Sequence, residues 1–294
     1  MSLDGAVLVD KPVGLTSNFV LQKTKKLFGA RKAGHAGTLD PLASGLLVVL
    51  FGEATKFASF LLEDDKEYMA TLKLGERTST GDAEGEIVER KDVPGEIPAS
   101  VLARFVGEIE QVPPMYSALK RDGVPLYKLA RRGETVERAA RSVRISAIEV
   151  LRFEAPLLEL RVRCSKGTYV RTLAEDIGRA LGTVAHLAAL RRTASGQFRV
   201  EGASTPEALE GAADRRSCVL PLAAMLSGLP RADLDADAMG RFRNGEAVPS
   251  QRSEPLCGVY GPGGTVLGLG RADETGRLRP LRVVAWAQAA EKAR

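Results

Sequence analysis

Several residue types are scarce in this 294-residue chain, and each scarcity excludes a class of protein. The chain has three widely spaced cysteines: Cys164, Cys218 and Cys257. Because their number is small and odd, we expect free thiols in the cytoplasm and not a disulfide framework. Two histidines, His35 and His186, and no close cysteine pair leave the usual zinc spacings absent, so we expect no metal. We expect neither a secretory signal nor a membrane helix, because no apolar run approaches the roughly 20 residues that a membrane helix needs.

Acidic residues are missing from one long stretch near the N-terminus. None occurs from Lys11 to Leu39, where six basic residues do: Lys11, Lys23, Lys25, Lys26, Arg31 and Lys32. A second basic segment, residues 116–144, holds eight basic and three acidic residues. Either tract alone is typical of a solvated helix face. Two of them in a chain of net charge +5 favour a polyanionic partner, because Lys and Arg neutralise nucleic-acid phosphates.

The N-terminal part predicts a short strand over residues 6–9 and a turn that ends in a helix N-cap at Thr16 or Ser17. A basic amphipathic helix should follow and turn four apolar side chains inward: Phe19, Val20, Leu27 and Phe28. Residues 34–45 then read as a glycine-rich loop, and residues 46–51 as a buried strand. The first carboxylate after the acid-free stretch, Asp40, would therefore lie on a loop between core elements.

Further along, alternation and turn residues predict a helix over 53–62, a strand over 68–74, a helix over 99–105, paired strands over 143–150 and 157–164, and a helix that ends at Gly182. Residues 78–85 are turn-rich and too polar for the core. The basic segment 116–144 reads as an extended loop with a short helix, a plausible RNA-contacting insertion.

Composition changes after about residue 226, where a linker-like stretch leads into short apolar pieces separated by glycines and turns. This pattern predicts a small β-barrel-like domain over residues 227–294 and leaves residues 1–226 as the larger, catalytic portion.

The sequence around Asp40 is compatible with a functional carboxylate. Asp-Pro is a common turn dipeptide, and on that ground alone Asp40 would be an ordinary turn residue. Glycines at 34, 37 and 45 allow close backbone approach of a ligand, and the basic flank would keep the carboxylate ionised. Arg171, in a separate segment, could pair with it. Asp40 is therefore a candidate nucleophile or general base.

Three aromatic or imidazole side chains are candidate RNA contacts. His35, five residues before Asp40, could be a satisfied loop histidine or could stack on a nucleotide. Tyr68 and Tyr169 would by default be half-buried aromatics, but beside a basic cleft they could stack on an extruded base. Residue chemistry thus indicates an RNA-directed enzyme centred on one carboxylate.

In several ordered blocks the chain resembles the TruB family, bacterial tRNA pseudouridine synthases that act on uridine 55 in the T arm. These blocks are GAVLVDKPVGLTS (5–17), GHAGTLDPLASGLLVVLFGEATKF (34–57), KEYMATLKLGERTSTGDAEG (66–85), PPMYSALKRDGVPLYKLARRG (113–133), CSKGTYVRTLAEDIG (164–178) and HLAALRRTASG (186–196). They cover roughly residues 5–226. The C-terminal piece resembles a PUA domain in size, position and turn-strand rhythm.

The resemblance implies an α+β fold with a mixed-sheet catalytic domain, an RNA cleft and a PUA-like domain. It implies that Asp40 initiates isomerisation of a flipped-out uridine, by attack on the ribose or the base or by removal of a ribose proton. The remaining implied roles concern substrate contact and orientation: Tyr68 stacks on the base and assists deprotonation at C5, Arg171 pairs with Asp40, Tyr169 and Leu190 line the base pocket, His35 supports the T loop, and Lys11, Asp82, Lys120, Arg131 and Arg132 contact RNA or line the cleft.

An isomerisation needs no external reactant, so the resemblance implies no cofactor. Family members often carry Asp where this chain has Ser79, which affects one polar contact near the cleft. A non-catalytic tRNA-binding or tRNA-folding protein is an alternative, as is a synthase directed at another RNA or guided by a partner complex. The insertion at 116–144 and the short C-terminal domain favour action on tRNA without a protein partner, and a monomer is the default expectation.

Overall fold

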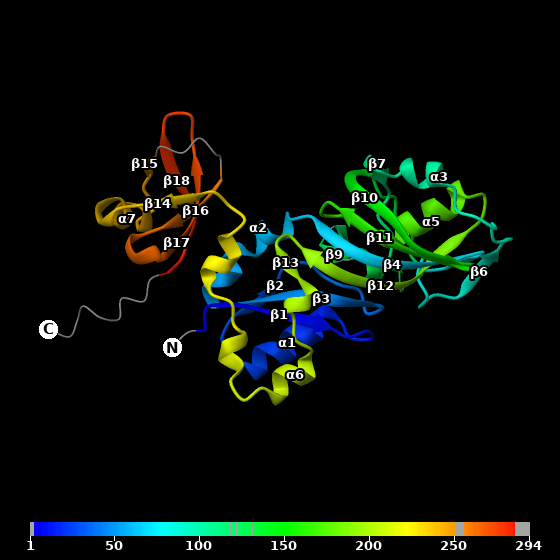
Figure 1. The fold of residues 1–294 in the computed structure, drawn as a ribbon, viewed down its shortest axis with the longest axis horizontal. Coiled ribbons are helices and arrows are strands. Elements are labelled where there is room, and N and C mark those ends of the chain that lie inside the picture. The colour runs from blue at the N-terminus through cyan, green and yellow to red at the C-terminus, as the bar shows by residue number, and fades with distance from the viewer. Residues whose placement is uncertain (1–2, 118, 122, 131, 251–255, 286–294) are drawn as a thin grey trace.

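The computed structural model describes residues 3–117, 119–121, 123–130, 132–250 and 256–285. Its centre is a nine-stranded mixed sheet (Figure 1). The main path runs β1 (Gly5–Lys11), β3 (Ala43–Phe51), β12 (Ala185–Ser195), β4 (Lys66–Leu74), β11 (Leu157–Cys164), β10 (Arg141–Glu154) and β7 (Gly107–Gln111). Two short strands extend it, since β2 (Ala33–His35) pairs with β3 and β13 (Phe198–Arg199) with β12.

One parallel pairing joins two otherwise antiparallel parts of this sheet. β12 runs parallel to β3, with Leu190 opposite Ala43 and Arg192 opposite Gly45, and antiparallel to β4, with Arg192 opposite Tyr68. The start of β3 follows directly on the loop that carries Asp40. The parallel pair therefore brings the middle of β12 beside that loop.

Helix α1 (Ser17–Leu27) covers one face of the β1–β3 part of the sheet. The predicted N-cap is confirmed, because the Thr16 hydroxyl accepts a hydrogen bond from the Phe19 amide at 3.1 Å. Val20 and Leu21 are buried against Val7, Val9 and other β1 and β3 side chains. The prediction for Phe19 is wrong: its side chain is 53% exposed, because it lies one position away from the stripe that meets the sheet.

A second core forms around α5 (Val170–Ala180), which packs on β4, β11 and β12. Its apolar face buries Leu173, Ala174 and Ile177. Gly182 lies two residues beyond it at φ +78°, close to the predicted helix end. The paired strands predicted over 143–150 and 157–164 are confirmed as the β10–β11 hairpin.

The remaining predicted elements also occur. Residues 52–62 form a 3₁₀ helix, η1 (Gly52–Phe57), and α2 (Ala58–Leu62), while 99–103 form α3 (Ala99–Ala103). The polar segment 78–85 differs from expectation, since Thr78 and Asp82 are buried: residues 81–83 bond to Leu187 at the edge of β12. Shorter elements complete this part: β5 (Glu76–Thr78), β6 (Ile87–Arg90), β8 (Lys120–Arg121), β9 (Val124–Pro125), α4 (Leu126–Ala130), η2 (Val200–Gly202), α6 (Pro206–Gly211), η3 (Arg215–Cys218) and η4 (Leu222–Leu226).

The C-terminal part has its own five-stranded sheet at one end of the molecule (Figure 1). Its order is β14 (Arg231–Asp233), β16 (Cys257–Tyr260), β17 (Val266–Ala272), β18 (Arg277–Val283) and β15 (Val248–Pro249), with α7 (Ala236–Arg243) and η5 (Pro262–Gly264) between strands. Tyr260 and Leu269 share an apolar cluster with Phe57 and Met225, so this sheet packs on the larger part. The domain boundary at residues 226 and 227 stays a prediction. In the described ranges, no helix is long and apolar enough to cross a membrane.

The close approach of β3 and β12 depends on Gly45. Its φ is +99°, and a Cβ there would meet the Arg192 carbonyl oxygen at 2.3 Å. We expect Gly45→Ala to lower the free energy of unfolding by about 3 kcal/mol, from backbone strain and the clash. Gly29→Ala is the matched control, since Gly29 has φ +62° with nothing within 4 Å and should cost only about 1 kcal/mol. Urea unfolding measures both; equal losses would contradict this reading.

Candidate active site

Asp40 lies on the loop between β2 and β3, and its side chain is 45% exposed. Ser17, the first residue of α1, anchors this loop through two hydrogen bonds. The buried Ser17 hydroxyl donates to the Leu39 carbonyl at 2.9 Å and accepts from the Leu39 amide at 2.8 Å. The backbone just before Asp40 is thus anchored to the helix, while the carboxylate itself faces open space.

Arg171 joins two carboxylates at this point. Its Nη2 lies 2.9 Å from Asp40 Oδ2, and its Nη1 lies 3.4 Å from Asp82 Oδ2. The Arg171 and Asp82 side chains are 7% and 4% exposed, so this half of the network is shielded from water. An ion pair in such surroundings is stronger and better ordered than one on an open surface. The predicted partnership of Asp40 with Arg171 is present.

Two backbone carbonyls complete the surroundings of the Arg171 guanidinium. Nη2 donates to the Tyr116 carbonyl at 2.5 Å and Nη1 to the Thr80 carbonyl at 3.4 Å. Asp82 is itself held, because its Oδ1 accepts from the Thr80 hydroxyl at 2.6 Å and the Glu84 amide at 3.1 Å. These contacts fix the orientation of the Arg171 side chain. Asp82, Arg171 and Asp40 therefore form a fixed network of charged groups, of which Asp40 is the exposed member.

Two pockets meet at Asp40. The smaller, of about 280 Å³, is lined by Tyr68, Tyr169 and Leu190 together with Arg192 and Lys66. The larger, of about 510 Å³, is lined by His35, Asp82, Tyr116 and Tyr127. Both include Thr38, Leu39, Asp40, Ser117 and Arg171. The carboxylate therefore stands where the two pockets meet; we name the smaller one the inner pocket and the larger one the outer pocket.

The inner pocket contains three of the predicted site residues on different elements. Tyr68 comes from β4, Leu190 from β12 and Tyr169 from the N-terminus of α5. Burial raises the pKa of the Tyr68 phenol, and burial likewise raises the pKa of Tyr169. Both phenols therefore stay neutral near pH 7. The pocket offers aromatic and apolar walls to a flat, uncharged ring.

The outer pocket holds His35, at the end of β2. Its Nδ1 is buried without a hydrogen-bond partner, and burial, aided by nearby Arg192, lowers its pKa. The imidazole is therefore neutral near pH 7 and keeps an unused polar atom. Tyr116, Ser117 and Tyr127 of the 116–144 segment also line this pocket, whereas the RNA contact predicted for the segment stays a prediction.

Lys11 does not line either pocket, contrary to expectation. Its side chain is fully buried and its Nζ donates to the Pro12 and Leu15 carbonyls at 2.8 and 2.7 Å, because the turn after β1 folds back over it. Gly45 also differs from its predicted purpose, since it admits the backbone of β12 and not a ligand.

Three further predicted RNA contacts belong to the 116–144 segment: Lys120, Arg131 and Arg132. Lys120 belongs to strand β8. Arg132 is exposed, its Nη1 lies 4.0 Å from Glu134 Oε1, and it lines neither pocket. Arg131 lies outside the described residues. Their RNA contacts stay predictions.

Sequence reasoning missed Arg192 and Lys66. Arg192 is 1% exposed and, among the described residues, forms no ion pair; it donates to the carbonyls of Leu46 at 2.7 Å, Gly37 at 3.1 Å and Thr38 at 3.4 Å. Lys66 is 7% exposed and donates to the Leu62 carbonyl at 2.7 Å. Within HLAALRRTASG, the alternation of strand residues puts Arg192 on the same face as Leu190, which is the signal that could have found it.

This arrangement suits acid-base or nucleophilic chemistry on a neutral ring. It offers one exposed carboxylate held by a buried guanidinium, two neutral phenols, and buried cations at Lys66 and Arg192 that make the inner pocket electropositive. The described residues include no group of three or more His, Cys, Asp or Glu side chains placed to hold a metal.

Comparisons with known proteins point in one direction. Residues 25–170 match the family model for the N-terminal domain of TruB family pseudouridylate synthases, residues 171–227 a C-terminal domain of tRNA pseudouridylate synthase B, and residues 230–284 a C-terminal domain of pseudouridine synthase II TruB. The chain is 53% identical to the tRNA pseudouridine synthase B of Cupriavidus metallidurans, and 53% identical to that of Ralstonia nicotianae. In each case the alignment covers 95% of this chain and 94% of the relative.

Solved structures agree on the fold. An H/ACA RNP bound to a substrate RNA containing 2′-deoxyuridine matches 96% of this chain and 85% of its own, with a TM-score of 0.74 and 28% identity. A Cbf5–Nop10–Gar1 complex matches with a TM-score of 0.73 and 30% identity, over 96% of this chain and 84% of its own. The predicted α+β fold with a large mixed sheet and a PUA-like C-terminal domain is confirmed.

Burial of Lys11 predicts a pH dependence of stability. Burial, partly offset by Asp40, lowers its pKa from 10.5 to about 8. Between these two values the unfolded chain binds a proton that the folded protein has lost, so this group makes the protein more stable as pH rises, by at most about 1.4 kcal/mol per pH unit. Urea unfolding from pH 7.5 to 10 should show wild type gaining stability relative to Lys11→Met. A constant difference would show that the lysine stays charged.

Arg192 should hold the Asp40 loop through the carbonyls of Gly37 and Thr38. In Arg192→Met these bonds are lost, and we expect hydrogen exchange of the amides in residues 36–42 to accelerate about tenfold. Arg191→Met is the control, because the guanidinium of Arg191 forms an ion pair with Asp10 at 2.7 Å and does not contact the loop. Unchanged exchange in Arg192→Met, or equal acceleration in both variants, would refute the assignment.

Proposed function

This chain belongs to the TruB family of tRNA pseudouridine synthases, and we propose that it isomerises uridine 55 in the T arm of tRNA to pseudouridine with Asp40 as the catalytic group. The observation that carries the assignment to Asp40 is the 2.9 Å ion pair with buried Arg171 at the junction of the two pockets. Among the described residues, Asp40 is the one carboxylate common to both pockets.

The inner pocket suits a single extruded base. Its aromatic and apolar walls, formed by Tyr68, Tyr169 and Leu190, can replace the stacking that the base loses when it leaves the RNA helix. Base extrusion costs a few kcal/mol, which such stacking and phosphate contacts can offset. The outer pocket would then hold flanking nucleotides, with the unpartnered His35 Nδ1 available to one of them.

The reaction conserves atoms and electrons within the nucleotide. The C1′–N1 bond breaks, the uracil rotates in the pocket, and a C1′–C5 bond forms; C5 then loses its proton and N1 gains one. No oxidant or second substrate is required. Asp40 would begin the sequence at the ribose or at the base, and Arg171 would keep its carboxylate aimed at that nucleotide.

The structure refines the role proposed for Tyr68. Its raised pKa keeps the phenol protonated, which makes it a poor proton acceptor in the resting site. We therefore assign it to stacking on the uracil and to hydrogen bonding; it can accept the C5 proton only after its own phenol proton has passed to N1, the atom that the isomerisation protonates.

Recognition of the RNA would rest on the cations around the cleft and on the 116–144 segment, whose Tyr116 and Tyr127 already form one wall. We propose that the protein acts on tRNA without a protein partner and as a monomer, in line with the insertion at 116–144 and the short C-terminal domain. We place the reaction in the cytoplasm, where the thiols of Cys164 and Cys218 would stay reduced.

Release of tritium from tRNA labelled at uridine C5 tests the proposal. Wild type should release it, whereas Asp40→Asn should be at least roughly 1,000-fold slower, because the amide can neither attack nor accept a proton. Asp237→Asn, on the exposed first turn of α7, is the matched control and should be fully active. Substantial activity in Asp40→Asn would contradict the catalytic assignment. Retained pseudouridine 55 in tRNA from a deletion strain would contradict the substrate.

A further inference from the structure

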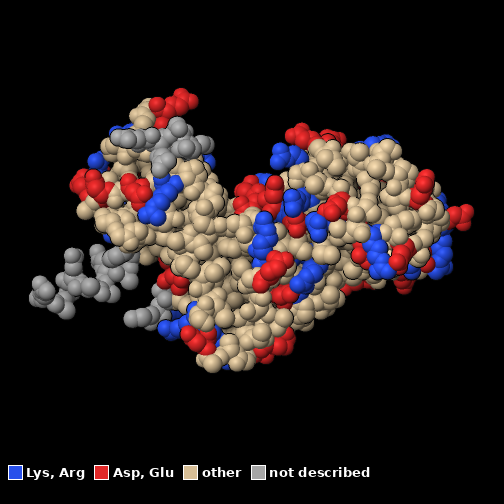
Figure 2. All heavy atoms as spheres, in the orientation of Figure 1, with Lys and Arg blue, Asp and Glu red and all other residues tan. Residues whose placement is uncertain are grey.

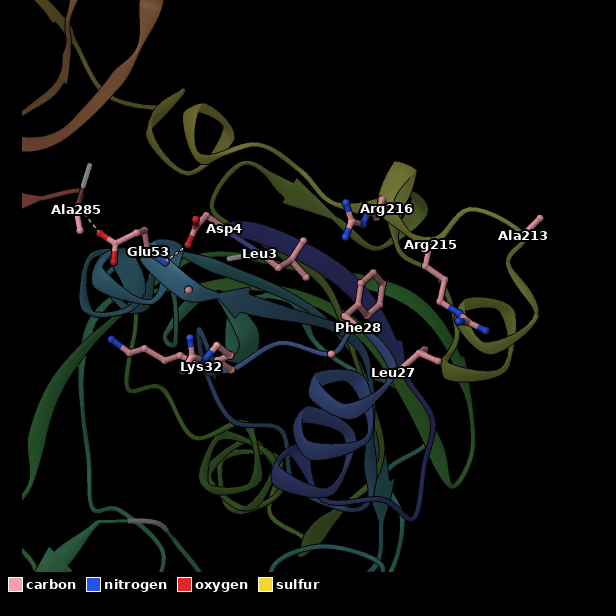
Figure 3. A pocket seen from close by; sticks show the side chains of 13 residues that line it. Leu3, Asp4, Leu27, Phe28, Lys32, Glu53, Ala213, Arg215, Arg216 and Ala285 are labelled. Atoms are coloured by element: carbon pink, nitrogen blue, oxygen red, sulfur yellow. Dashed lines mark hydrogen bonds between the residues drawn. The ribbon is translucent and has the colours of Figure 1, made fainter. Parts of the chain in front are cut away.

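A second groove of the described chain lies away from Asp40. It has a volume of about 680 Å³ and is formed by the N-terminal residues, the end of α1, the start of η1 and the segment 213–216 (Figure 3). The acid-free tract that stood out in the sequence supplies two of its lining cations, Arg31 and Lys32. This groove plays no part in the function proposed above.

The acidic groups of the groove are already satisfied. Asp4 Oδ1 accepts from the Glu53 amide at 2.7 Å, and Glu53 Oε2 accepts from Lys56 Nζ at 2.7 Å and from the Ala285 amide. Figure 3 shows these two carboxylates together at one end of the groove.

The cations are in the reverse situation. Arg31, Lys32 and Arg216 are exposed, and none of their side chains has a hydrogen bond or an ion pair with any described residue. Arg215 alone is engaged, since it donates to the Leu209 and Glu210 carbonyls at the end of α6. On the face drawn in Figure 2, basic and acidic side chains are interspersed.

The floor between these cations is apolar and includes an aromatic ring. Leu3, Leu27 and Phe28 line it, and Figure 3 shows Phe28 between Leu3 and Leu27, with Arg216 nearby. The far side of Phe28 is supported by Phe51, with ring centroids 5.3 Å apart. Cations without side-chain partners beside a half-buried aromatic and apolar floor are features of sites that bind a nucleic-acid strand.

The groove is within reach of an RNA bound at Asp40. Helix α1 connects the two places, because Ser17 at its start bonds to Leu39 and Leu27 at its end lines the groove. Eleven helical residues span about 16 Å, roughly five nucleotide steps along a strand. A single tRNA can therefore contact both places at once.

We propose that this groove binds the phosphate backbone of the tRNA substrate outside the T arm, as a second contact that the catalytic pockets do not provide. The proposal rests on tRNA being the substrate, as proposed above. Arg31, Lys32 and Arg216 neutralise phosphates, and the apolar floor accommodates a ribose or base at the same point. The contact raises affinity for whole tRNA and leaves the chemical step at Asp40 unaffected.

The test compares a full-length unmodified tRNA transcript with an isolated T-arm stem-loop. In Arg31→Gln/Arg216→Gln we expect the dissociation constant for full-length tRNA to rise about tenfold and the salt dependence of log K to lose about two units of slope. Affinity for the T-arm stem-loop and its rate of isomerisation should stay those of wild type. The matched control, Arg104→Gln/Arg271→Gln, removes two exposed arginines elsewhere and should leave the affinity for both RNAs unchanged.

Unchanged affinity for full-length tRNA would overturn the proposal, and so would an equal loss on both RNAs, because the cations would then act on the T arm or on the fold. A tenfold loss of affinity for full-length tRNA in the control variant would show that net charge alone causes the effect, and it would likewise overturn the proposal. Continued isomerisation of the stem-loop keeps a failure here separate from a failure of the function proposed for Asp40.

Discussion

The site depends on one buried guanidinium. Arg171 lies between Asp40, which is open to solvent, and Asp82, which is not, and two carbonyl oxygens take its remaining directions. A buried arginine with one acidic partner would be free to rotate about that contact. With four acceptors the Arg171 guanidinium is fixed in orientation, and through the ion pair it also fixes the orientation of the Asp40 carboxylate. Elements from distant parts of the chain supply these acceptors, so the site is complete only in the folded protein.

The single parallel pairing in the large sheet explains how those elements meet. It brings β12 against the start of β3, where Gly45 lets the backbones approach, and so delivers Leu190 and Arg192 to the Asp40 loop. Arg192 then ties that loop to β12 through the carbonyls of Gly37 and Thr38, and donates a third hydrogen bond to Leu46 in β3. Sheet architecture and site geometry are therefore set by the same contact.

Local signals in the sequence predicted the elements and the exposed side of the site. The Thr16 cap, the strand at 46–51 and the loop position of Asp40 follow from turn residues and apolar periodicity, and the ordered motifs indicated the partners of Asp40. The burial of Asp82, Lys11 and Arg192 could not be predicted in this way. Each is a polar residue whose environment is made by strands or loops far away in sequence, and composition alone assigns such residues to the surface.

The most direct test of the central claim is a double-mutant cycle on the chemical step. Single-turnover rates at saturating enzyme would be measured for Arg171→Met, Asp82→Asn and the double variant, with tRNA dissociation constants for each. If Asp82 acts through Arg171 to hold Asp40, Arg171→Met should slow isomerisation about 100-fold and Asp82→Asn about tenfold. The double variant should be no slower than Arg171→Met, and tRNA affinity should be nearly unchanged. Multiplicative losses would contradict the account, because the two residues would then act independently.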